Sequence, residues 1–153
     1  MRVFLMAMIV CLAAPVLEAA PPVAPPPQSE LDALAGIYVQ CPRKNEARCD
    51  QAVADFRLVF PNGQPHPFFM IRKGGNGYLA ADERMTTDFI IEEHSPETLI
   101  FRMDDRSKTR MELQKRGKVW RERQGGDIYI KAIEDSEWNV SPEPFKNKQR
   151  KSK

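Results

Sequence analysis

The chain has 153 residues, of which 42% are hydrophobic and 29% are charged, and its net charge at pH 7 is +2. That length is enough for one domain and too short for two of ordinary size. Residues 142–153 hold five basic side chains and one acidic one, so the rest of the chain is slightly acidic. Because a nucleic-acid-binding domain carries its positive charge on a folded face, this distribution predicts a protein that does not bind nucleic acid.

Residues 1–19 are typical of a secretory signal peptide. Arg2 supplies a short positive start, residues 3–17 are almost wholly apolar, and Ala19 is a small residue suited to a cleavage site. The apolar stretch is too short to span a membrane and prolines follow it, so we expect cleavage; an uncleaved anchor is the alternative. The sequence therefore predicts an exported protein, periplasmic or extracellular, with no membrane span after cleavage.

Both ends of the mature chain are predicted to lack regular structure. Residues 20–29 contain five prolines, which favour an extended linker and cannot supply a hydrogen-bonded ladder. Residues 141–153 begin with Ser-Pro-Glu-Pro and continue as a lysine-rich tail with too little apolar surface to fold. We expect this tail to be solvated and disordered, with electrostatic contact to an anionic envelope surface as the alternative. The folded domain is expected over residues 30–140.

Cys41 and Cys49 are the cysteines that remain once Cys11 leaves with the signal peptide. In an oxidising compartment we expect them to form a disulfide. Closing this short loop would remove roughly 2.6 kcal/mol of unfolded-chain entropy. Free thiols are the first alternative. A redox or metal role is less favoured, because the sequence has no C-x-x-C spacing here and no further Cys or His at zinc-site spacing.

The domain is predicted to open with a short helix. Ser29 begins a segment that resembles a capping box, and Leu31 and Leu34 lie on one side of the helix. Gly36 is able to end it, and a first strand follows over residues 37–40.

One or two further helical turns are predicted within residues 46–56. Cys49, Val53 and Phe56 recur there at spacings of four and three residues. The disulfide would then tether these turns to the end of the first strand.

From residue 56 onward, short apolar segments separated by turn residues predict successive strands. The predicted strands are residues 56–60, 68–72, 87–92, 98–103, 109–115, 118–124 and 127–133. No long helix separates them, and parallel pairs need crossovers of a dozen or more residues. The fold is therefore predicted to be all-β, a single antiparallel meander forming a small barrel or curled sheet of about eight strands.

The last strands allow predictions of register. A two-residue turn at Arg116-Gly117 predicts these opposite pairs: Leu113 with Trp120, Glu112 with Arg121 and Met111 with Glu122. One face of this hairpin is then apolar, with Glu122 as its exception. Because a buried carboxylate without a partner is costly, we place Glu122 at an open rim or, alternatively, in a recognition site.

Two loop lengths decide which faces the neighbouring strands share. For Phe101 and Met111 to lie on one face, the loop after residue 103 must have an odd number of residues, three or five. The turn at residues 125–126 leaves two registers open. A two-residue loop places Tyr129 and Ile133 on the face of Trp120, whereas a three-residue loop places Ile128 and Ile130 there. Both faces of this last strand carry apolar residues, so one of them is expected to meet another element.

A short helix, then Gly36-Ile37-Tyr38 and about eight strands, resembles the start of a lipocalin-like barrel, where Gly-x-Trp or Gly-x-Tyr opens the first strand. This chain has tyrosine in place of the commoner tryptophan and adds the segment between its two cysteines. The resemblance implies a central cavity for a small apolar ligand. Its lining candidates are Tyr38, Phe101, Met111, Trp120 and Glu122. The alternative, which we favour, is that these residues fill the core, as is common in small barrels.

No arrangement typical of catalysis or metal binding is recognised, so we expect a non-enzymatic protein without metal or cofactor. His66 lies in a turn and His94 at a strand end, both expected at the surface and neither with a metalloprotease pattern. Asp104 and Asp105 are adjacent and are best explained by a solvated hairpin tip. The glycines of residues 74–77 lack the remainder of a phosphate-binding loop.

Two classes of function stay open. The first is an exported binding protein that docks on or inhibits another envelope protein. Its predicted contact residues are arginines of a charged strand face, Arg102, Arg110, Arg121 and Arg123. A solvated outer face is the simpler explanation of these arginines. The second is a carrier of a small apolar ligand. An enclosed cavity of at least about 300 Å³ would favour the carrier, and a filled core with an arginine-lined groove or protruding loop would favour the binding protein.

Overall fold

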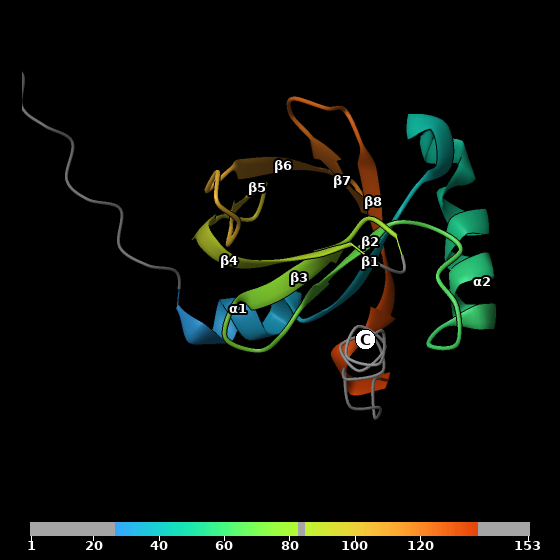
Figure 1. Ribbon diagram of the computed structural model, residues 1–153, viewed down its shortest axis with the longest axis horizontal. Coiled ribbons are helices and arrows are strands. Elements are labelled where there is room, and N and C mark those ends of the chain that lie inside the picture. The colour runs from blue at the N-terminus through green and yellow to red at the C-terminus, as the bar shows by residue number, and fades with distance from the viewer. Residues whose placement is uncertain (1–26, 83–84, 138–153) are drawn as a thin grey trace, which may run out of the picture.

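The computed structural model describes residues 27–82 and 85–137. Within these ranges, eight antiparallel strands follow one another around a closed barrel, in which β1 pairs with both β2 and β8 (Figure 1). The strands are β1 (Gly36–Gln40), β2 (Phe68–Ile71), β3 (Asn76–Ala80), β4 (Thr86–His94), β5 (Thr98–Met103), β6 (Arg110–Arg116), β7 (Val119–Glu122) and β8 (Ile128–Glu134). The all-β prediction is confirmed. The predicted signal peptide, most of the proline-rich linker and the basic tail lie outside the described residues.

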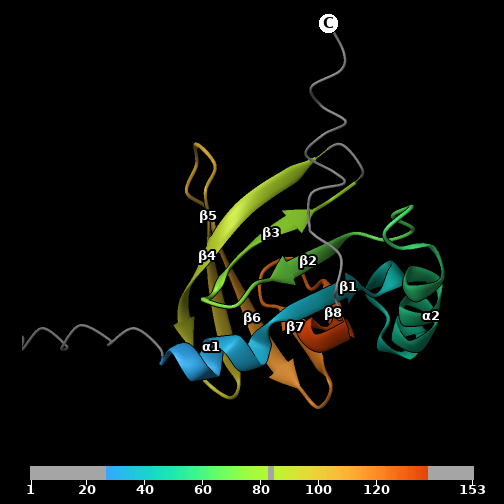
Figure 2. The same cartoon turned by 90° about the horizontal axis from the view of Figure 1, so that it is seen from below.

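Helical segments accompany the barrel at its end and on its side. They are α1 (Gln28–Leu34), α2 (Cys49–Val59) and the 3₁₀ turns η1 (Pro42–Lys44), η2 (Glu46–Arg48) and η3 (Asp135–Glu137). In both views α2 lies on the side of the barrel away from β4 and β5 (Figures 1 and 2). None of the helices in the described ranges is long and apolar enough to cross a membrane.

Alternation along the strands points one set of side chains into the barrel. This inner cluster consists of Leu31, Tyr38, Phe69, Ile71, Phe89, Ile91, Leu99, Phe101, Met103, Met111, Leu113, Trp120 and Tyr129. Each is no more than 9% exposed. Leu31 belongs to α1, so this helix closes one end of the barrel.

A second apolar cluster lies outside the barrel wall, beneath α2. The helix buries Ala52 and Phe56 against outward-facing side chains of the wall, among them Val39 of β1 and Ile130 of β8. This explains why β8 carries apolar residues on both faces, as expected from the sequence. One face fills the barrel and the other receives α2.

The predicted strand at residues 56–60 is wrong, because α2 continues to Val59. Phe56 and Phe60 lie on one side of the chain at helical spacing, with their rings stacked 4.6 Å apart. Leu58 between them is 84% exposed. The eighth strand is instead β3, which was missed because Gly77 was assigned to the preceding glycine-rich turn.

The β6–β7 hairpin turns at residues 117–118, so the predicted register is wrong by two residues. Leu113 lies opposite Glu122, and Lys115 lies opposite Trp120. Gly117 has a φ of +59°, which suits the first central position of a type II′ turn and therefore determines where the chain reverses. An even shift leaves every side chain on its predicted face.

The other two loop predictions can be compared with the observed pairing. Phe101 lies opposite Met111, and the Met103 amide donates to the Thr109 carbonyl, so five residues form the loop and the odd count is confirmed. Trp120 lies opposite Tyr129, so Tyr129 shares the face of Trp120, as the first of the two predicted registers requires. Ile133 instead packs against the outer cluster, since the β1–β8 register shifts between residues 37 and 38.

The helix α1 begins earlier than predicted and without the expected cap. Its N-cap residue is Pro27, no side chain caps it, and Ser29 lies within the helix. Leu31 and Leu34 face the barrel as expected. Gly36 does not end the helix; it opens β1 with a φ of +145°, where a Cβ would come within 2.6 Å of the Ile133 carbonyl oxygen.

Hydrogen bonds and close packing hold α1 over the barrel end. The Tyr38 hydroxyl donates to the Leu34 carbonyl at 2.8 Å, and the Gly74 amide donates to Asp32 Oδ1 at 3.0 Å. A Cβ on Gly75 would lie 2.9 Å from Leu31 Cδ1. The glycines of the β2–β3 turn therefore allow α1 to approach the sheet closely.

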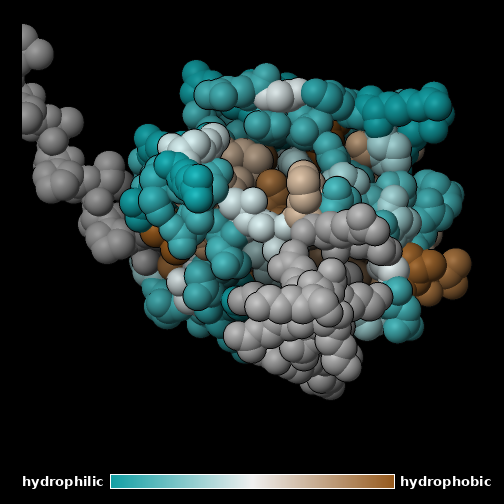
Figure 3. Space-filling model, viewed as in Figure 1, coloured by the Kyte–Doolittle hydropathy of each residue, from teal (hydrophilic) through white to brown (hydrophobic). Residues whose placement is uncertain are grey.

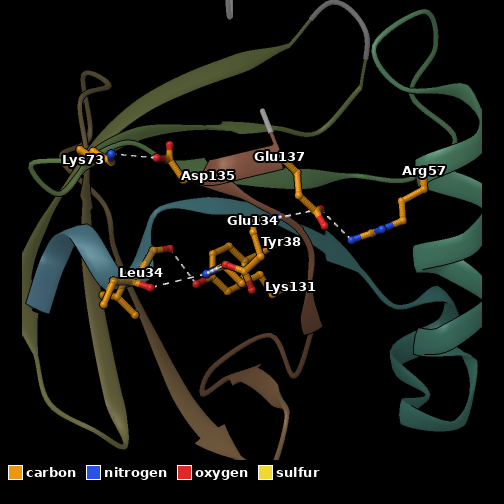
Figure 4. Close-up of polar contacts among 9 residues, drawn as sticks. Leu34, Tyr38, Arg57, Lys73, Lys131, Glu134, Asp135 and Glu137 are labelled. Atoms are coloured by element: carbon orange, nitrogen blue, oxygen red, sulfur yellow. Dashed lines mark hydrogen bonds and ion pairs between the residues drawn. The ribbon is translucent and has the colours of Figure 1, made fainter. Parts of the chain in front are cut away.

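Polar contacts gather around the end of β8 (Figure 4). Arg57 of α2 donates from Nε to the Ala132 carbonyl at 2.6 Å and pairs with Glu137 at 2.9 Å. Lys131 pairs with Glu134 at 2.6 Å and lies over the Tyr38 ring. These contacts join α2 and the first strand to the end of the last one.

The predicted disulfide is present between Cys41 and Cys49, whose Cα atoms are 4.7 Å apart. Cys41 directly follows β1 and Cys49 begins α2, and both are buried. The bond therefore tethers α2 to the barrel wall that it covers, as expected.

Candidate functional site

The predicted ligand residues Tyr38, Phe101, Met111 and Trp120 do come together inside the barrel. The space between them is filled by other side chains. The ring of Phe69 lies at its centre, with ring centroids at 4.7 Å for Tyr38, 5.1 Å for Phe101, 5.0 Å for Tyr129 and 6.4 Å for Phe89. Because these partners come from β1, β5, β8 and β4, one side chain bridges opposite walls.

Glu122, the fifth ligand candidate, is half-buried at the end of β7. It shares the inward face with Leu113, but its carboxylate folds against Gly125 in the β7–β8 loop. In the part of the chain that the structure describes, this carboxylate makes no ion pair. The position agrees with the rim location and separates Glu122 from the ring cluster.

The four predicted contact arginines do not form one group. Arg102 and Arg110 lie directly opposite each other and share Glu92, at 2.9 and 2.8 Å. Arg123 pairs with Glu112 at 3.0 Å. Arg121 lies further along the wall opposite Gln114 and Ile128 and has no ion pair among the described residues. Each of the first three is thus largely neutralised by the barrel itself.

An open groove of about 400 Å³ lies on the outer wall across β3, β4 and β5. Its lining residues are Arg72, Asn76, Gly77, Asp88, Phe89, Ile90, Arg102, Met103, Asp104 and Lys108. This is the side of the barrel that α2 does not cover (Figures 1 and 2).

The pairing of the strands arranges five outward side chains in one row across the groove. The Arg72 amide donates to the Asn76 carbonyl, so these two residues are neighbours across β2 and β3. Asn76 lies opposite Ile90 on β4, and Ile90 lies opposite Arg102 on β5. Arg102 in turn lies opposite Arg110 on β6. The row therefore crosses β4 at its middle, with Ile90 at the centre and arginines towards both ends.

Two charged groups of the groove remain unpaired. The guanidinium of Arg72 lies 5.6 Å from the centre of the Tyr78 ring, and its Nε has no hydrogen-bond partner. Asp88 lies directly opposite Tyr78 on the neighbouring strand. Neither Arg72 nor Asp88 forms an ion pair within residues 27–82 and 85–137. The groove thus presents a cation and an anion on the two sides of one tyrosine.

An exposed apolar side chain accompanies these charges. Ile90 is 42% exposed in the middle of the groove. Among the described residues, the other large apolar side chains that are exposed lie elsewhere: Leu58, Val59 and Met85. The view of Figure 3 is mainly hydrophilic, with a hydrophobic patch at the edge occupied by α2. Ile90 therefore combines apolar exposure with neighbouring unpaired charge.

Sequence reasoning missed Arg72 and Asp88 as site residues. Asp88 was placed in a predicted strand, and Arg72 at the end of another, without a face being assigned. The signal that could have identified them is alternation along the strands, because Arg72, Asp88 and Tyr78 all point outward from the barrel. Tyr78, however, belongs to β3, the strand that was not predicted.

The histidines are more enclosed than expected. His66 and His94 have side chains 20% and 12% exposed, each 3.5 Å from a carboxylate, of Asp55 and Glu30 respectively. The segments of α2 and α1 cover them, which a turn or strand-end position does not reveal. No group of three His, Cys, Asp or Glu side chains suited to a metal ion occurs in the described ranges.

Asp104 and Asp105 lie at the exposed tip of the β5–β6 hairpin. A hydrogen bond from Lys108 lowers the pKa of Asp104, and a hydrogen bond from Ser107 lowers the pKa of Asp105. Both carboxyl groups are therefore ionised at neutral pH and hydrogen-bonded locally.

The stability of the barrel at high pH is expected to depend on Tyr78. Burial raises the pKa of Tyr78 to about 12, against 10.0 for an exposed tyrosine. Its stabilising contribution is complete below pH 10 and is lost as pH rises from 10 to 12, because the unfolded chain ionises first. Between pH 9 and 11, urea titration should show wild type losing about 1 kcal/mol more than Tyr78→Phe. Equal losses would contradict this expectation.

Comparison with models of protein families, with curated proteins and with solved structures finds no match to this chain. The lipocalin-like resemblance rests on Gly36-Ile37-Tyr38 and stays a prediction. The groove is defined here by its own geometry, as an uncovered barrel wall with an exposed apolar centre and two unpaired charges.

Proposed function

We propose that this protein is an exported, non-enzymatic binding protein that docks on or inhibits another protein of the cell envelope. Its docking surface is the groove on β3, β4 and β5. The observation that carries the proposal is the combination of exposed Ile90 with unpaired Arg72 and Asp88 on a wall that α2 leaves open. Protein interfaces commonly join an apolar centre to arginine and other polar groups at its margin.

The filled interior supports this proposal over a small-ligand carrier. A carrier needs an enclosed apolar space, whereas Phe69 and its ring partners occupy the middle of the barrel. The groove on the outer wall is open and carries charge, which suits a protein surface better than a small apolar molecule.

Export is part of the proposal and is supported by two independent features. The first is the signal-peptide pattern of residues 1–19. The second is the buried Cys41–Cys49 disulfide, because such bonds persist in oxidising compartments.

Photo-crosslinking in cells of the source organism tests the proposal. Benzoylphenylalanine replaces Ile90 in the groove and, as the matched control, Leu58 on α2, which is also an exposed aliphatic residue. We expect a covalent adduct with a second protein from position 90 and none from position 58.

Identical adducts from both positions, or no adduct from position 90, would contradict the docking surface. Native mass spectrometry of the protein isolated from the envelope supplies the opposing outcome. A retained lipid together with no adduct would favour the carrier.

A further inference from the structure

We infer that the groove receives a short segment of the partner protein with an acidic, an apolar and a basic side chain, in that order or reversed. The acidic group pairs with Arg72, the apolar group packs on Ile90 and the basic group pairs with Asp88. This inference rests on the proposed function and adds the chemistry of the bound segment.

The charges argue for a segment that carries both signs. Arg102 and Arg110 are already satisfied by Glu92, and Lys108 pairs with Asp104. What the groove leaves free is one guanidinium and one carboxylate, at Arg72 and Asp88. A purely acidic ligand would be repelled by the like charge of Asp88, and a purely basic ligand would be repelled by the like charge of Arg72. Only a ligand with one charge of each sign complements both.

The spacing argues for a peptide segment. Arg72 and Ile90 are two strand positions apart, about 10 Å, since neighbouring strands lie about 4.8 Å apart. Asp88 and Ile90 are two residues apart on β4, about 7 Å. In an extended peptide, side chains on one face repeat at about 7 Å, and long charged side chains cover the remaining difference. Because Arg72 lies across the strands from Ile90 whereas Asp88 lies along β4, the two directions are perpendicular, and the two charged positions are about 12 Å apart. An acid–x–apolar–x–base segment, about 14 Å from its first to its fifth residue when extended, therefore reaches all three groups by bending at its apolar residue.

Tyr78 keeps the two charges apart. Its ring lies beneath the Arg72 guanidinium, and its backbone is opposite Asp88. No ion pair closes across it in the described part of the chain, so a ligand does not first have to break one. Binding of the segment therefore gains two ion pairs against the cost of desolvating the two charges, without the further cost of breaking an internal pair.

Calorimetric titration with synthetic peptides tests the inference. The probes are acetyl-Gly-Glu-Ser-Leu-Ser-Lys-Gly-amide and the same peptide with glutamate and lysine exchanged, because the chain direction in the groove is open. We expect one of them to bind with a dissociation constant below about 1 mM. Arg72→Gln and Asp88→Asn should each weaken binding at least about tenfold, and Arg116→Gln, at an exposed arginine at the end of β6, should leave it unchanged.

A double-mutant cycle identifies the pairing. With glutamine in place of the peptide's glutamate, the peptide should no longer distinguish wild type from Arg72→Gln, while Asp88→Asn should still weaken it. Urea midpoints equal to wild type establish that the variants are folded. Additive losses, or no peptide binding, would overturn the inference. Binding of phosphatidylglycerol vesicles that Asp88→Asn strengthens would overturn it in favour of an anionic surface.

The two proposals fail separately. A protein adduct from position 90 without peptide binding leaves the docking function intact and removes only the segment chemistry. Absence of that adduct would contradict the docking function itself, whether or not the peptides bind.

Discussion

Replacement of Phe69 by alanine is expected to lower the free energy of unfolding by about 3–5 kcal/mol, the largest effect of any single change proposed here. Phe69 is fully buried at the centre of the inner cluster and contacts rings from β1, β4, β5 and β8. Its removal deletes the apolar area of one ring and leaves a cavity that the closed, hydrogen-bonded wall is poorly able to collapse.

Equilibrium urea unfolding followed by tryptophan fluorescence measures this loss, with Trp120 in the same inner cluster as a reporter. Leu58→Ala is the matched control, because Leu58 is apolar but 84% exposed and should change stability by less than about 0.5 kcal/mol. Equal stability of the two variants would show that the barrel interior is not the packed core described here, and would reopen the carrier function.

Loss of the disulfide is expected to be the second largest effect, about 2–3 kcal/mol in the double variant Cys41→Ala/Cys49→Ala. The bond restricts the unfolded chain over a sequence separation of 8 residues. In the folded protein it fixes the start of α2 against the end of β1, beside the outer cluster that holds Phe56. Alanine avoids leaving a buried hydroxyl, so the loss reports the bond rather than an unsatisfied polar group.

Reduction provides the control for this prediction. Dithiothreitol should lower the urea midpoint of wild type towards that of Cys41→Ala/Cys49→Ala and should leave the double variant unchanged. If the reductant leaves wild type unaffected, the bond contributes nothing to stability. If it also lowers the midpoint of the variant, the effect lies elsewhere in the chain.

Several features of the fold follow from local sequence because they depend on alternation and on pairing between neighbours in the chain. Residues 98–103 and 110–116 show a period of two, and a loop of odd length between them places Phe101 and Met111 on one face. Cys41 and Cys49 are the two cysteines after the signal-like segment, so their pairing is the simplest solution.

The boundary between α2 and the strands was beyond local reasoning. The residues from Phe56 to Phe60 fit a strand as well as a helix, since Phe56 and Phe60 share a face at either spacing. The helix forms because the outer apolar side chains of the barrel wall offer a surface on which it buries Phe56 and leaves Leu58 in solvent. Likewise β3 begins at Asn76, next to glycines that resemble a turn, and exists because β2 and β4 pair with it on both sides.

By itself, the amino-acid sequence determined the antiparallel class, the disulfide and which residues of the later strands face inward, because these depend on period and short-range spacing. Tertiary structure alone decided that the interior is filled around Phe69 and that Arg72, Asp88 and Ile90 share a groove. Arg72 directly follows β2, whereas Asp88 and Ile90 lie two residues apart on β4. Their proximity depends on the register of β3 and on which wall α2 covers, and both are set by packing between segments distant in the chain.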